Sequence, residues 1–174
     1  MAGKRAAPPP PPTDADTDRF ASPACALAEV DPAYRGFMPR EELIALLNEL
    51  LEAEQAGVKV ANAFLDSAGD GQTAALLRDL RRDEARYAAL LGRLVNDLGG
   101  TPSGKIGGFY EKAVAVDGMA ARLAFLNRGQ GWVVKKLREA LPRIAEDNVH
   151  AALKEMLETH DANIARCAPF AAAG

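Results

Sequence analysis

The sequence predicts an all-α protein in which four long helices form one bundle behind a proline-rich N-terminal arm. Hydrophobic residues make up 48% of the 174 residues and aromatic residues only 6%, with alanine and leucine dominant, which is typical of helical bundles. Four stretches carry apolar residues at alternating spacings of three and four, the period of a helix that is buried on one face. A chain of this length can bury one sizeable core, so we expect a single domain with an appendage.

Residues 1–38 are expected to form a largely irregular arm. The proline run Pro8–Pro12 favours an extended polyproline conformation, and residues 1–19 cannot supply a packed core. Residues 20–38 contain scattered apolar side chains that would let this part lie along the bundle surface. We interpret the arm as a solvated tether, with recognition of a partner protein as the alternative.

The first predicted hairpin begins at Pro39, which suits a helix start, and turns at residues 66–71, which are rich in glycine and aspartate. The second helix of this hairpin ends at Gly99 and Gly100. The two stripes that predict these helices are Leu43, Leu47, Leu50, Glu54, Gly57, Ala61 and Phe64, and then Leu77, Leu80, Glu84, Tyr87, Leu91, Leu94 and Leu98.

The second predicted hairpin follows a longer glycine-rich connection, residues 101–108, and a short helix within residues 109–116. We expect Asp117 to cap the third long helix, Pro142 to end it and Asp147 to begin the fourth. The bundle would then span residues 39–168, and residues 169–174 would form a C-terminal tail. The stripes are Leu123, Leu126 or Asn127, Gln130, Val134 and Leu137, and then Val149, Leu153, Met156, His160, Asn163 or Ile164, and Cys167.

Three ionisable residues occupy the middle of these apolar stripes: Glu54, Glu84 and His160. A charge turned toward a core needs a partner or a metal, because its desolvation is costly. Glu54 and Glu84 are equally far from the first turn, so antiparallel packing predicts that they face each other. The same arithmetic about the second turn places Gln130 level with His160.

These positions resemble those of the ferritin-like superfamily, whose members hold two iron or manganese ions inside a four-helix bundle. The strings at 50–57, 83–87 and 156–160 look like a bacterial ferritin-like family of unassigned function. The resemblance covers residues 39–168 and implies that Glu54, Glu84 and His160 stand at ligand positions.

The sequence also departs from that pattern. Tyr87 stands where the first histidine is expected, Leu157 where the second acid is expected, and Gln130 or Asn127 at the carboxylate position of the third helix. Because two divalent ions need about four carboxylates to approach neutrality, a paired-metal centre is not expected.

Two interpretations of the remaining site stay open. In the first, protonated His160 lies between Glu54 and Glu84, and the Tyr87 hydroxyl and the Gln130 amide complete a metal-free network. In the second, the two glutamates and His160 hold one divalent ion of iron, manganese or zinc, with Gln130 and Tyr87 as weaker ligand candidates. The sequence favours the first, and therefore a non-catalytic association or accessory protein with no cofactor; a metal-binding, redox-active ferritin-like protein is the alternative.

The remaining features limit partners and location. A net charge of −3 gives no electrostatic footprint for nucleic acid. No apolar stretch is long enough for a membrane span, and the proline run replaces the apolar segment of a secretory signal. Two distant cysteines suit a reducing compartment. We therefore expect a cytoplasmic protein that forms a homo-oligomer or binds a protein partner through its arm.

Overall fold

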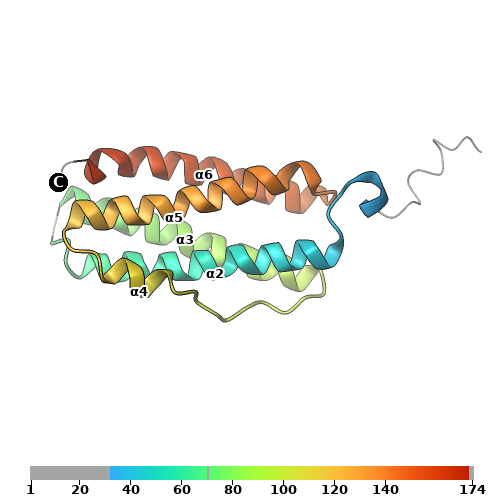
Figure 1. Ribbon diagram of the computed structural model, residues 1–174, viewed down its shortest axis with the longest axis horizontal. Coiled ribbons are helices and arrows are strands. Elements are labelled where there is room, and N and C mark those ends of the chain that lie inside the picture. The colour runs from blue at the N-terminus through green and yellow to red at the C-terminus, as the bar shows by residue number, and fades with distance from the viewer. Residues whose placement is uncertain (1–31, 70, 173–174) are drawn as a thin grey trace, which may run out of the picture.

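The computed structural model describes residues 32–69 and 71–172, and all regular secondary structure in this part of the chain is helical (Figure 1). The prediction of an all-α protein is confirmed. Most of the predicted arm, residues 1–31, lies outside the described residues. The elements are the 3-10 turns η3 (Pro32–Arg35) and η4 (Leu141–Arg143) and the helices α2 (Arg40–Leu65), α3 (Gln72–Asp97), α4 (Phe109–Val114), α5 (Met119–Ala140) and α6 (Asp147–Ala171).

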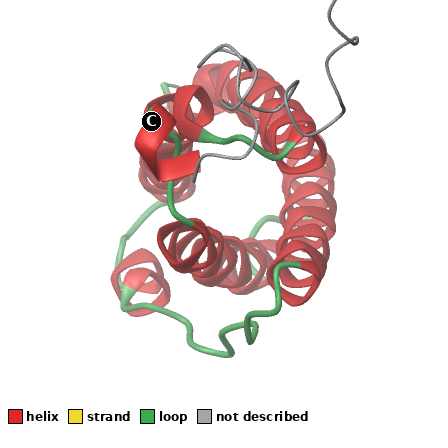
Figure 2. Cartoon of the chain, turned by 90° about the vertical axis from the view of Figure 1, so that its right-hand side faces the viewer, coloured by secondary structure: helices red, strands yellow, loops and turns green. Residues whose placement is uncertain are grey.

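The four long helices surround one core, as the view along their axes shows (Figure 2). α2 packs chiefly on α3, α5 chiefly on α6, and further contacts of α2 with α5 and of α3 with α6 join the two hairpins. Each long helix runs antiparallel to both of its neighbours (Figure 1). α2 and α6 are diagonally opposite and do not pack on each other, and the same holds for α3 and α5. The short helix α4 lies outside this ring, against α2 and α5.

The long connection between the hairpins runs back along α2. It leaves α3 through Gly99, whose φ of 76° suits glycine, and the Gly100 N–H donates to the Val95 carbonyl at 2.8 Å, as in a Schellman motif. Further along, the Asn48 amide donates to the Thr101 carbonyl at 3.2 Å. The polar face of α2 thus fixes the path that leads to α4.

The same face of α2 holds Ser103 in place with three side chains. The Ser103 N–H donates to the Asn48 amide oxygen at 2.7 Å, and its hydroxyl donates to the Glu52 carboxylate. The Gln55 amide donates to the Ser103 carbonyl at 3.2 Å. Because these three α2 residues lie on one side of the helix, the connection follows that side toward the middle of the bundle.

The core consists of two apolar clusters, one toward each end of the bundle. The larger surrounds the first half of α2 and the smaller surrounds its second half. Fully buried side chains of the larger cluster include Leu43, Leu47, Leu50, Leu91, Leu137 and Leu153, and those of the smaller include Val60, Phe64, Leu77, Leu80 and Cys167. All four predicted stripes therefore face the interior, which is the main source of stability for amphipathic helices.

Two helix ends differ from expectation. The prediction that Asp117 caps the third long helix is wrong: Gly118 occupies the capping position with a φ of 81°, and no side chain caps that end. An aspartate one residue earlier lies outside the first turn, because the chain enters the helix through a conformation that favours glycine. At the other end of the chain, α6 continues to Ala171 and thus includes the first three residues of the predicted tail.

Candidate metal centre

A layer of polar side chains crosses the bundle at the height where the two apolar clusters meet. Each long helix contributes one member: Glu54 from α2, Glu84 from α3, Gln130 from α5 and His160 from α6. None is more than 5% exposed. The predicted meeting of the two acids and the histidine in the interior is thus observed, and water contributes little to compensating their polarity.

His160 is oriented by a bond within its own helix. Its Nδ1 lies 3.0 Å from the Met156 carbonyl oxygen, which can only accept, so Nδ1 carries the proton and donates. The other ring nitrogen, Nε2, then faces Glu54 and lies 3.1 Å from its Oε1. In a neutral imidazole Nε2 holds a lone pair, the form in which histidine binds metals.

Glu84 is placed by an amide and by a glycine. The Gln130 amide donates to its Oε1 at 3.3 Å, so Gln130 bonds to Glu84 across the bundle. Gly57 on α2 leaves room for the same carboxylate: a Cβ at that position would lie 2.3 Å from the Glu84 Oε2. A glycine inside a helix costs about 1 kcal/mol relative to alanine, so this close approach explains why the position has no side chain.

The two hydrogen bonds that orient these side chains cross the bundle diagonally. His160 to Glu54 joins α6 to α2, and Gln130 to Glu84 joins α5 to α3, although neither pair of helices packs directly. The side chains therefore meet on the bundle axis. The nearest ligand atoms of Glu54, Glu84 and His160 all lie within 4.8 Å of one another.

Tyr87 does not take its expected place. Instead of bonding to a carboxylate, its hydroxyl lies 2.7 Å from the Thr159 hydroxyl and donates to the Glu155 carbonyl at 3.3 Å. Only its ring reaches the polar layer, with its centroid 5.7 Å from that of His160. The prediction that the Tyr87 hydroxyl takes part in the network is wrong. A buried tyrosine hydroxyl needs a partner, and α6 supplies two partners outside the layer.

Two polar atoms of the layer have no hydrogen-bond partner among the described residues. They are Oε2 of Glu54 and Oε1 of Gln130. An unpartnered buried oxygen costs about 1–3 kcal/mol, so such atoms call for an explanation. A cation beside Glu54 would supply one.

The chain matches a known protein family over most of its length. The family described as "Domain of unknown function (DUF6306)" matches residues 41–169, which include every member of the polar layer. The chain belongs to this family. No curated protein and no solved structure matches it.

The electrostatics of this DUF6306 domain follow from burial. Loss of hydration raises the pKa of Glu54 to about 8. Hydrogen bonding between the Glu54 and Glu84 side chains acts in the opposite direction but is the smaller effect. Burial, followed by repulsion from Glu54, raises the pKa of Glu84 well above its usual range. A carboxyl that is desolvated beside another carboxyl favours its neutral form. The layer therefore retains protons at neutral pH unless another cation replaces them.

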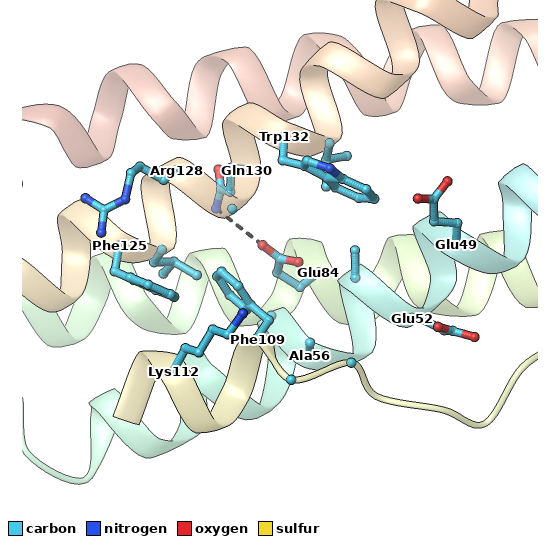
Figure 3. Close-up of a pocket in the computed structure, with 17 residues that line it drawn as sticks. Glu49, Glu52, Ala56, Glu84, Phe109, Lys112, Phe125, Arg128, Gln130 and Trp132 are labelled. Carbon is cyan, nitrogen blue, oxygen red and sulfur yellow. Dashed lines mark hydrogen bonds between the residues drawn. The ribbon is translucent and has the colours of Figure 1, made fainter. Parts of the chain in front are cut away.

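The polar layer of the DUF6306 domain also borders a cavity. A space of about 480 Å³ lies between α2, α4 and α5, and Glu84 and Gln130 form part of its wall (Figure 3). Sequence reasoning missed this cavity and the role of Gly57. A glycine in the buried stripe, three residues after Glu54, was the available signal for the second.

No helix of the described residues has both the length and the apolar character that crossing a membrane requires.

Proposed function

We propose that this DUF6306 domain is a ferritin-like four-helix bundle that binds one divalent metal ion through Glu54, Glu84 and His160. The observation that carries the proposal is the convergence of three potential ligand atoms, from three different helices, within 4.8 Å of one another. Carboxylate oxygens and imidazole nitrogens bind such ions at about 2.0–2.2 Å, so two ligands of one ion lie up to about 4.4 Å apart. Small side-chain rotations would bring the three atoms into range.

Charge supports one ion. Two ionised carboxylates balance a single divalent cation, whereas a second cation would leave net positive charge in a dry core. The ion would replace the protons that Glu54 and Glu84 hold at neutral pH, and it would lie near the unpartnered Oε2 of Glu54. Mixed nitrogen and oxygen ligands suit iron, manganese and zinc. Bound iron or manganese would supply redox chemistry that the side chains lack.

The arrangement of the helices supports the ferritin-like assignment. Two antiparallel hairpins are joined by one long connection, and a polar residue projects inward from the middle of each long helix. Metal sites of ferritin-like proteins are built from such inward-facing residues on all four helices. The Gln130 position supplies an amide here, which is a weaker ligand than a carboxylate.

A metal-free network is the second candidate, because two hydrogen bonds already link the four side chains in pairs. In that case the layer would specify how the helices pair, and the protein would act as a non-catalytic accessory or self-associating subunit, with residues 1–38 as its docking segment. A cytoplasmic location fits either candidate.

Elemental analysis separates the two candidates. The protein would be purified without chelators or metal-affinity resin and then dialysed against iron, manganese or zinc. We expect about one ion per chain in the wild type and nearly none in Glu84→Gln or His160→Gln. Glu158→Gln removes an exposed carboxylate two residues before His160 and should retain the ion. If Glu84→Gln and His160→Gln both keep the full metal content, the assignment is wrong.

A further inference from the structure

The cavity beside the polar layer has features of a ligand site that metal binding does not explain. Its volume of about 480 Å³ falls within the range of about 300–1,000 Å³ that is typical of small-molecule pockets. One wall consists of Phe109 from α4 and Phe125 from α5, whose rings stack with centroids 5.0 Å apart. Trp132, which is 39% exposed, lines the cavity further along α5 (Figure 3).

A glycine holds this aromatic wall in place. A Cβ at Gly129 would lie 2.5 Å from the Phe109 Cζ, so α4 rests against α5 only because position 129 has no side chain. The connection that leads to α4 is itself bonded to α2 through Asn48, Glu52 and Gln55. The cavity is therefore bounded by elements that are fixed by specific contacts.

The charges at the two ends of the cavity differ. Glu49 and Glu52 lie at one end, and Lys112 and Arg128 lie at the end with the two phenylalanines (Figure 3). Glu49 pairs with Lys136 at 3.0 Å.

The charge of Glu49 is thus compensated by Lys136, and the Glu52 carboxylate accepts a hydrogen bond from the Ser103 hydroxyl. At the opposite end, neither Lys112 nor Arg128 forms an ion pair with a carboxylate of the described residues, and the Arg128 guanidinium carbon lies 5.1 Å from the centroid of the Phe125 ring. Two exposed cations without a carboxylate partner in the described part of the chain therefore line the aromatic end of the cavity.

We propose that this cavity binds a small aromatic carboxylic acid, with its carboxylate at Lys112 and Arg128 and its ring against Phe109, Phe125 and Trp132. Aromatic walls favour a flat apolar body, and charge-assisted hydrogen bonds from a guanidinium and an ammonium group favour a carboxylate. Bound in this way, the apolar body extends toward Glu84. The inference goes beyond metal binding, because none of the groups that recognise the ligand is a proposed metal ligand.

The test uses the full-length protein without metal, titrated with 3-phenylpropionate and with its neutral analogue 3-phenylpropanamide. Calorimetry measures the affinities, and fluorescence of Trp132, the only tryptophan in the chain, reports binding at the cavity. We expect the acid to bind about five- to tenfold more tightly than the amide. In the variant K112Q/R128Q this preference should fall below about twofold, with the affinity for the amide unchanged.

A matched variant, K154Q/R93Q, removes two exposed cations from α6 and α3, outside the cavity, and should keep the preference for the acid. Three results would overturn the proposal. In the first, the wild type binds both probes equally or binds neither. In the second, K112Q/R128Q retains the preference for the acid. In the third, the wild type is a dimer that binds neither probe and that dissociates on Trp132→Ala. The last result would assign this face to a second copy of the chain. Because metal is absent throughout, failure here leaves the test of the metal site unaffected.

Discussion

The two hairpins contribute unequal chemistry to the same layer of the core. The α2–α3 hairpin supplies two carboxyl groups, Glu54 and Glu84, whereas the α5–α6 hairpin supplies an amide and an imidazole, Gln130 and His160. Each carboxyl is bonded across the bundle to a group of the other hairpin. The α2–α3 hairpin therefore supplies both acidic groups of the layer, and the α5–α6 hairpin supplies the side chains that form hydrogen bonds with them. This inequality supports one divalent ion in the layer in place of two.

The largest expected effect concerns the protons on the acidic hairpin. The pKa of Glu54 is about 8 when folded and close to 4.5 when unfolded, so the folded chain binds more protons between these values. The contribution of Glu54 to the free energy of unfolding of the metal-free protein should then be highest below about pH 4.5–5. It should fall as pH rises toward 8, by on the order of a few kcal/mol.

Denaturant unfolding with a chelator present, across pH 5.5 to 8.5, measures this dependence. The variant E54Q/E84Q cannot ionise at these positions and should show a much flatter profile. A wild-type stability that rises over this range, or a double variant with the same slope, would contradict the account of the acidic hairpin.

The second expected effect concerns the room that α2 leaves for Glu84. Gly57→Ala places a Cβ 2.3 Å from the present position of the Glu84 Oε2, so the carboxylate must move. We expect a loss of about 1–3 kcal/mol in the free energy of unfolding. Gly92→Ala on α3 is the control, because a Cβ there meets nothing within 4 Å. It should stabilise the protein by about 0.5–1 kcal/mol, and a similar gain for Gly57→Ala would refute the close approach.

The third test makes the two hairpins more alike. Gln130→Glu places a third carboxyl in the layer with little change of shape, and a third negative ligand should raise the affinity for a divalent ion at least about tenfold, or about 1.4 kcal/mol. Calorimetric titration with zinc or manganese measures the change. Gln72→Glu adds the same group at the exposed start of α3 and should leave the affinity unaltered. Equal affinities for both variants would mean that the ion binds elsewhere.

How much of this arrangement follows from the sequence depends on how local each interaction is. The spacing of Leu43, Leu47 and Leu50 predicts a helix, because burial on one face requires that period. The equal distances of Glu54 and Glu84 from their turn predict that they meet, because the α2–α3 hairpin is short and antiparallel. Both predictions need only the geometry of one helix or one hairpin.

Features that depend on how the hairpins dock escaped prediction. The Tyr87 hydroxyl bonds to Thr159 because α3 packs beside α6, which the sequence of α3 does not indicate. The cavity exists because α4 lies against α5 at Gly129 after a connection held along α2. The role of Gly57 escaped for a different reason: it lies within one hairpin but depends on the conformation of the Glu84 side chain on the adjacent helix.

The smallest expected effect tests that placement of Tyr87. Tyr87→Phe removes the hydroxyl bonded to Thr159 and should lower the free energy of unfolding by about 1 kcal/mol. Metal content should be unchanged, since the hydroxyl does not bond to the carboxylates. Loss of the ion in this variant would return Tyr87 to the list of ligands.

A crystal grown with zinc or manganese and measured at the absorption edge of that metal would locate the ion. If the polar layer holds it, one anomalous peak should lie on the bundle axis, about 2.0–2.2 Å from Glu54, Glu84 and His160 Nε2. A core without such a peak, with metal bound only at surface carboxylates, would contradict a metal site in the polar layer.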